Sequence, residues 1–403
     1  MSHADRYLRS SLLLVRYRDG LILVHPGSSV ILLTDDLGAR VAMRLIRGHS
    51  EGDMRAWAES RLAGSGDRVG ELVDRLEMIG ALTTEAPRRG LRWRVRSALS
   101  LLAGWALGLA SIVVPLLPVS VLHAAFDTLP HTPLAARTVG QIQSYVDANL
   151  RASGYADTTE QWRHAIARSC AAASARTYFM MYLMLVLEPP KLRRVMSALF
   201  DMESFAELER TLHDTEGGVL AGLHTSLYIG IIVLLGASGR RLAVLADMTA
   251  LGANVGDSAL PGLDMYGQYA ALLDSHSRMV GKALLKRLRA GELAVLAFDA
   301  PPQGSTNMAA MPHIGLMGRP VYRFDGAAWV AIHTGKPIVF VSTYQEGRKT
   351  KVYVQPPLYA NPKLPRRAQV EDLTARMYAA ADTFLRQHPE AWMAWCYLHD
   401  LVV

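Results

Sequence analysis

The turn around His224 is the part of the sequence best suited to chemistry. His224 ends the stretch GGVLAGLH, which reads as a short buried strand running into a turn, and a helical segment follows over residues 225–235. The pKa of histidine is near neutrality, so this side chain suits a site that must take up and release a proton. The pattern indicates a candidate active site at this junction between strand and helix.

Asp299 and two arginines are also placed to act on a ligand. Asp299 follows the apolar strand LAVLAF and precedes two prolines. Sheets of α/β proteins hold their sites at such strand ends, although an aspartate there equally suits a simple turn. Arg319 and Arg323 follow a turn at Gly318. Because arginine makes bidentate contacts with phosphate, they either bind a phosphate group or form a solvated face.

The composition excludes several other chemistries. The 403 residues include two cysteines, Cys170 and Cys396, and neither lies in a motif, which excludes a disulfide scaffold and a cysteine-rich zinc site. His313 and His333 have no partner at a metal-ligand spacing, so we expect no metal. The sequence also lacks a phosphate-binding Walker loop, a Gly-x-Ser-x-Gly elbow and a dinucleotide-binding glycine motif followed by an acid.

The charge distribution favours a membrane surface. The formal net charge is +7 and the mean hydropathy is +0.13. Five arginines precede an uncharged stretch at 97–126: Arg88, Arg89, Arg92, Arg94 and Arg96. Basic residues beside an apolar run are typical of the cytoplasmic side of a membrane element. We expect Ala98–Val114 to form a membrane-embedded helix, or else part of a buried helical hairpin, and we expect no nucleic-acid partner because no aromatic-and-basic motif occurs.

The first 86 residues are predicted to form a small α+β domain of the winged-helix kind. Three strand-like runs, at Ser11–Tyr17, Leu21–His25 and Ser29–Leu33, include a hairpin signal at Arg18-Asp19-Gly20. Three amphipathic helices are expected next, over Leu37–Ile46, after Ser50 and over Val69–Ile79. Ser50 followed by Asp53 is typical of a capped helix start.

The rest of the chain changes from helices to alternating strands and helices. Helical patterns run from residue 127 to about residue 212, and apolar strands then alternate with helices, which favours an α/β fold with a mostly parallel sheet and an antiparallel edge strand at KVYVQPPL. We therefore predict three segments: a small domain at 1–86, a basic linker and apolar helix at 87–126, and an α/β domain at 127–403.

Four blocks of the α/β segment resemble the lipid A acyltransferase branch of the lysophospholipid acyltransferase superfamily. They are GVLAGLHTSLYIG, GKALLKRLRAGELAVLAFDAPPQG, MPHIGLMGRPVYRFDGAAWVAIHTGKPIVFV and HPEAWMAW. The resemblance implies that His224 is the catalytic base, which takes the proton from an acceptor hydroxyl or amine as it attacks a thioester. Backbone N–H groups and the dipole of the helix after it would help to stabilise the oxyanion.

The carboxylate that orients the histidine in that family is missing from its usual place. It lies five residues after the histidine, where this chain has Ile229. Three explanations stay open. A different acid, Asp247 or Asp299, orients His224; Tyr228 or Ser226 takes the place of the acid; or the module binds without transferring acyl groups.

The stretches LILVHPGSSVILLTDDLGARVAMRLIRGHS and VGELVDRLEMIGAL resemble the PQQ-biosynthesis D-protein family, a peptide-recognition module. In that family a leader peptide adds a strand to a sheet edge, which implies a leader peptide as partner of residues 1–86. The alternative is a regulatory domain that binds no peptide.

Together these patterns predict a membrane-associated acyltransferase with no cofactor beyond its donor, an acyl-CoA or acyl-carrier-protein thioester. The acceptor hydroxyl or amine belongs to a leader-bound ribosomal peptide or to a lipid or glycolipid. Ser226, Gly318, Arg319 and Arg323 are the expected substrate contacts. We expect the protein at the cytoplasmic face of a bacterial inner membrane, on an anionic surface. The non-enzymatic alternative is a peptide-binding membrane scaffold on a degenerate acyltransferase fold.

Overall fold

The computed structural model separates into two compact units. One comprises Met1–Leu116 with Asp247–Leu260, and the other comprises Leu117–Ala246 with Pro261–Val403. The structure describes residues 7–8, 13–17, 20–25, 30–34, 40–41, 44–45, 49–60, 69, 73, 82–83, 113, 117, 121, 124, 136–186, 189–246, 270–275, 277, 279–299, 311–396, 398 and 402. The three segments expected from the sequence stay a prediction.

The N-terminal unit contains two small antiparallel sheets. Strands β2 (Leu13–Tyr17), β3 (Gly20–His25) and β4 (Val30–Thr34) pair in sequence order, and β1 (Tyr7–Leu8) pairs with β5 (Leu82–Thr83). The three predicted strands are present within one or two residues of their expected bounds. Gly20 pairs with Tyr17, so it belongs to β3 and not to the turn between the strands.

The predicted helix after Ser50 is α2 (Glu51–Glu59), and it begins with a complete capping box. The Asp53 backbone N–H donates to the Ser50 hydroxyl at 3.2 Å, and the Ser50 N–H donates to the Asp53 carboxylate at 3.0 Å. Such a box satisfies two N–H groups that a helix start leaves unpaired. Most of the other two predicted helices lies outside the described residues.

The predicted apolar helix at Ala98–Val114 lies outside the described residues, apart from Val113. Among the helices that the structure describes, none combines the length and the apolar character needed to cross a bilayer.

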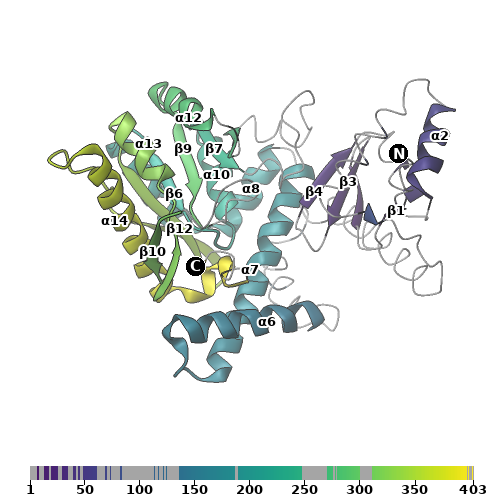
Figure 1. Cartoon of the computed structure of the whole chain (residues 1–403), viewed down its shortest axis with the longest axis horizontal. Helices are drawn as coiled ribbons and strands as arrows, with labels where there is room; N and C mark the ends of the chain where they lie inside the picture. The colour runs from purple at the N-terminus through teal and green to yellow at the C-terminus, as the bar shows by residue number, and fades with distance from the viewer. Residues whose placement is uncertain are drawn as a thin grey trace. The chain divides into compact units, whose positions relative to one another are not determined.

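A six-stranded sheet forms the centre of the second unit (Figure 1). Its strands lie in the order β13 (Lys349–Val354), β12 (Ile338–Glu346), β6 (Val219–Gly222), β9 (Leu293–Ala297), β7 (Leu242–Ala246) and β8 (Ala270–Asp274). All neighbours are parallel except β13, which runs antiparallel to β12 at one edge. The predicted mixed α/β class and antiparallel edge strand are confirmed, whereas β8 was not predicted.

Helices flank this sheet on both sides (Figure 1). The described helices are α6 (Ala136–Leu150), α7 (Glu160–Val186), α8 (Pro189–Leu199), α9 (Met202–Asp214), α10 (Tyr228–Ala237), α12 (Val280–Arg289), α13 (Gly326–Thr334) and α14 (Arg366–Gln387). A hairpin of β10 (His313–Leu316) and β11 (Arg319–Tyr322) adds a small separate sheet, and two 3₁₀ turns, Pro389–Ala391 and Met393–Cys396, follow α14.

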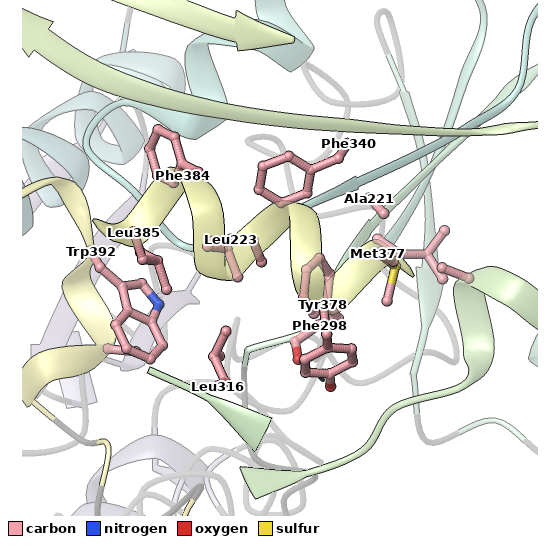
Figure 2. Packing of buried hydrophobic residues seen from close by; sticks show 14 of the residues in the cluster. Ala221, Leu223, Phe298, Leu316, Phe340, Met377, Tyr378, Phe384, Leu385 and Trp392 are labelled. Carbon is pink, nitrogen blue, oxygen red and sulfur yellow. Dashed lines mark hydrogen bonds between the residues drawn. The ribbon is translucent and has the colours of Figure 1, made fainter. Parts of the chain in front are cut away.

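Aromatic side chains from α14 fill the core against one face of the sheet (Figure 2). The ring centroids of Phe340 on β12 and Phe384 on α14 are 6.1 Å apart, and those of Phe298 and Tyr378 are 5.0 Å apart. These four side chains are buried. Because Phe298 immediately precedes Asp299, this packing fixes the place where the chain leaves β9.

Gly222 allows β6 and β12 to approach closely at the end of the strand. A Cβ atom at this position would lie 2.5 Å from the Val341 carbonyl oxygen, which is closer than real contacts allow. The glycine therefore sets the course of the chain toward His224, two residues later.

Candidate active site

His224 and Asp299 meet because their strands are neighbours in the sheet. β6 and β9 are parallel, with Gly222 opposite Ala297, and each candidate residue follows its strand by two positions. The imidazole Nδ1 lies 2.6 Å from Asp299 Oδ1, and the His224 backbone N–H donates to Asp299 Oδ2 at 2.8 Å. The carboxylate therefore binds both the ring and the backbone of the histidine.

The environment of this pair makes His224 more basic. The Asp299 side chain is 1% exposed and that of His224 is 22% exposed, so a substrate can reach the ring but water hardly reaches the acid. Burial by itself lowers the pKa of His224, but the charge of Asp299 and the hydrogen bond to it outweigh this effect, so the pKa lies above its ordinary value of 6.5. With its Nδ1 proton directed to the carboxylate, the ring has Nε2 available as a base.

The segment after α14 also contacts this pair. The Trp392 indole N–H donates to Asp299 Oδ2 at 2.8 Å, and the Met393 backbone N–H donates to the His224 carbonyl at 3.0 Å. Trp392 is fully buried, and its carbonyl oxygen lies 3.4 Å from the Cys170 thiol on α7. The C-terminal block PEAWMAW is thus part of the site structure.

Thr225 anchors the turn that follows the histidine. Its hydroxyl lies 2.8 Å from the Thr343 hydroxyl and 3.2 Å from the Ser342 hydroxyl, and it accepts the Thr343 backbone N–H at 3.1 Å. The Thr343 hydroxyl in turn donates to the Ser226 carbonyl. These contacts hold the turn against the carboxyl end of β12.

Comparison with known proteins adds the family. The family described as bacterial lipid A biosynthesis acyltransferase matches residues 91–400. The chain belongs to this family. No curated protein matches the sequence. Membership in the lipid A acyltransferase family supports an acyltransferase and suggests a lipid as the acyl acceptor. The match begins after the N-terminal unit's sheets, so the resemblance of residues 1–86 to a peptide-recognition module stays a prediction.

The helix after the histidine has no acid where the resemblance led us to expect one. Ile229 is 5% exposed and packs in the first turn of α10, among apolar side chains that are buried along most of the helix. A carboxylate at this buried position would need a partner to offset the loss of its hydration. Asp299 stands in contact with His224 instead, and Asp247, the other acid considered, lies outside the described residues.

Backbone N–H groups around the histidine are largely engaged within the fold. The N–H of His224 donates to Asp299, that of Leu227 donates to the Thr177 hydroxyl at 3.3 Å, and that of Tyr228 donates to the Thr225 carbonyl at 3.2 Å. These three N–H groups thus already have acceptors within the fold, and the expected stabilisation of an oxyanion by nearby N–H groups stays a prediction. Leu227 adopts φ 58°, a left-handed conformation that a non-glycine residue rarely takes, just before α10 begins.

Tyr228 and Ser226 both lie beside the histidine. The rings of Tyr228 and His224 meet edge to face, with centroids 4.9 Å apart. Ser226 is 2% exposed, and its hydroxyl has no hydrogen-bond partner among the residues that the structure describes. Neither side chain takes the place that Asp299 occupies at Nδ1.

The hairpin that carries Gly318, Arg319 and Arg323 is tied to the strand end of Asp299 through Tyr378. The Tyr378 hydroxyl accepts the Phe324 N–H at 3.1 Å and lies 3.3 Å from the Tyr322 carbonyl and 3.5 Å from that of Phe298. Burial raises the pKa of Tyr378, which keeps its hydroxyl protonated.

The two arginines of the hairpin region have different surroundings. Arg323 forms an ion pair with Asp325, with 2.9 Å between Nε and Oδ1, so part of its guanidinium is already engaged. Arg319 begins β11 and is partly exposed, next to the turn of Met317 (φ 53°) and Gly318 (φ 73°). No group of three or more potential metal ligands occurs in the described part of the chain.

Proposed function

We propose that this protein transfers an acyl group from an acyl-CoA or acyl-carrier-protein thioester to a hydroxyl or amine of a lipid acceptor. The observation that carries the proposal is the 2.6 Å contact between His224 Nδ1 and Asp299 Oδ1, with the ring partly exposed and the acid buried. A histidine held in one tautomer by a buried carboxylate is the arrangement that general-base catalysis of acyl transfer requires.

In the proposed reaction, His224 Nε2 removes the proton from the acceptor as its oxygen or nitrogen attacks the thioester carbonyl carbon. The carbonyl bond opens to an oxyanion, and the imidazolium is stabilised by Asp299. When the oxyanion collapses, the carbon–sulfur bond breaks and the thiol leaves with the proton that His224 returns. No step needs a metal or a redox partner.

The contact with Asp299 also bears on the non-enzymatic alternative. That alternative rests on the absence of an acid five residues after His224. The hydrogen bond between Asp299 and the His224 ring supports the reading in which an acid from the neighbouring strand takes that role. This contact therefore supports catalysis rather than a binding scaffold.

Arg319 is our proposed contact for a phosphate of the donor or of the acceptor headgroup. It is partly exposed, and no described side chain is paired with it, whereas Arg323 is held by Asp325. Since the family is typically membrane-associated, we propose an anionic membrane surface as the place of action, on the cytoplasmic side. Family membership favours a lipid acceptor over a leader-bound peptide.

The test is thioester cleavage by the full chain with acyl-CoA or acyl-carrier-protein as donor. Acceptors are supplied either as vesicles of the host's total lipid or as the host's protein and peptide fraction, and products are identified by mass. His224→Ala should abolish thiol release, whereas His333→Ala, which changes a histidine on α13, should not. Equal release by wild type and His224→Ala would refute the proposal. Acylation confined to the peptide fraction would refute the lipid acceptor.

A further inference from the structure

Asp299 receives three N–H groups, and one of them comes from a residue with no assigned role. Oδ1 faces the His224 ring, while Oδ2 accepts both the His224 backbone N–H and the Trp392 indole N–H, each at 2.8 Å. The backbone N–H and the ring belong to the histidine itself. Among the described residues, Trp392 is therefore the side chain other than His224 that donates a hydrogen bond to the Asp299 carboxylate.

Trp392 is held firmly enough to act as such a fixed donor. It is fully buried, its ring meets that of Trp395 edge to face at 5.0 Å, and its backbone pairs with Thr225 next to the histidine. Trp395 is buried to the same degree, but its indole N–H donates to the Pro389 carbonyl at 2.7 Å. The two tryptophans thus differ in what their N–H groups contact, which makes one a matched control for the other.

We propose that Trp392 is a positioning residue, which holds the Asp299 carboxylate through its indole N–H so that Asp299 can orient His224. The kinetic effect expected of Trp392 rests on the proposed acyl transfer, whereas its effect on the pKa of His224 does not. An indole N–H that is buried must donate to some acceptor, and here it donates to the one buried carboxylate of the site. Hydrogen bonds to charged groups are stronger than neutral ones, so this bond restricts the carboxylate's rotation.

Loss of this donor has a predictable electrostatic effect. The indole N–H stabilises negative charge on Oδ2. In Trp392→Phe the carboxylate keeps its two contacts with His224, and the same charge is then balanced more by the imidazolium, so the pKa of His224 rises further. Among the described titratable groups near the site, the Tyr228 ring of α10 meets that of His224, the Tyr378 hydroxyl of α14 lies near the Phe298 carbonyl, and the Cys170 thiol of α7 lies near the Trp392 carbonyl. Of the described residues, Asp299 is the one whose charge acts on His224.

The decisive measurement is the ring titration of His224 by NMR in the full chain, with His224→Ala used to assign its signal. We expect a higher His224 pKa in Trp392→Phe and an unchanged one in Trp395→Phe, although both variants lose one buried indole hydrogen bond and should lose similar thermal stability. No shift in Trp392→Phe, or the same shift in both variants, overturns the inference. This readout needs no turnover, so it stands even if the proposed acyl transfer fails.

The kinetic measurement separates positioning from general damage. We expect kcat of thioester cleavage to fall about tenfold in Trp392→Phe with KM nearly unchanged. In an Asp299→Asn background the same change should have little further effect, because the carboxylate on which it acts is absent. A Trp392→Phe effect that is equally large with and without Asp299 would show that Trp392 acts by another route.

Discussion

The Nδ1 atom of His224 and the Oδ1 atom of Asp299 are 2.6 Å apart, although 75 positions separate the residues in the chain. The acid comes from the strand next to the one that carries the histidine, rather than from the helix that follows it. Because Asp299 contacts the ring, no acid is needed at position 229, and Ile229 packs as a buried apolar residue in the first turn of α10. The pairing depends on the register of β6 and β9.

The charge of Asp299 should be essential to the rate. In Asp299→Asn the side chain keeps its shape but no longer stabilises the imidazolium or fixes the tautomer, so kcat should fall about a thousandfold or more. Thiol release from the acyl donor measures this loss. Asp372→Asn, which removes an acid from a half-exposed pair with Arg376 on α14, is the control and should retain full activity. Comparable rates for Asp299→Asn and wild type would exclude Asp299 as the orienting acid.

The pH dependence should report the raised pKa of His224. A base must be deprotonated, so kcat/KM should decline on the acid side with a midpoint above 6.5, the ordinary histidine value. In Asp299→Asn the opposing effect of burial is no longer outweighed, and the midpoint of the residual activity should move to lower pH. A profile with the same acid-side midpoint in both proteins would contradict this assignment.

Gly222 should tolerate no side chain. In Gly222→Ala the new Cβ meets the Val341 carbonyl oxygen at 2.5 Å, so β6 or β12 must shift, at a cost of about 1–3 kcal/mol in the free energy of unfolding. Chemical denaturation measures that cost, and activity should also fall because the shift occurs two residues before His224. Gly315→Ala on β10, where nothing lies within 4 Å of the added atom, should have a much smaller effect.

The neighbouring hydroxyls of Thr225 and Ser226 should behave differently. Thr225→Val leaves the Thr343 backbone N–H and nearby hydroxyls without their buried partner, so the free energy of unfolding should fall by about 1–3 kcal/mol. Ser226→Ala removes a buried hydroxyl that has no partner among the described residues, so stability should be unchanged or higher. A stability loss in Ser226→Ala as large as that in Thr225→Val would show that its hydroxyl is bonded.

The sequence predicted the elements of the α/β unit better than their pairing. Apolar runs marked β6, β7, β9 and β12 because strands buried on both faces lack polar positions. The edge strand β13 was also predicted, but β8 was missed because its five residues follow a long stretch without periodicity. The order of the strands, which places β9 beside β6, is a tertiary property that periodicity does not carry.

The same limit applies to the site. The positions of His224 and Asp299 at strand ends indicate a site, but nothing in the sequence states which strand end faces His224, so Asp247 and Asp299 are both candidates for the acid. The contact between Trp392 and Asp299 was missed. The block PEAWMAW was noted for its resemblance, yet no spacing rule links an indole N–H to a carboxylate 93 positions earlier.

The place of Trp392 in the chain has a consequence for synthesis. His224 and Asp299 leave the ribosome well before the segment at 389–396, so a nascent chain that ends within α14 carries the pair without the indole donor or the Met393 N–H that binds the histidine's carbonyl. The site is therefore completed after the rest of the sheet has been translated.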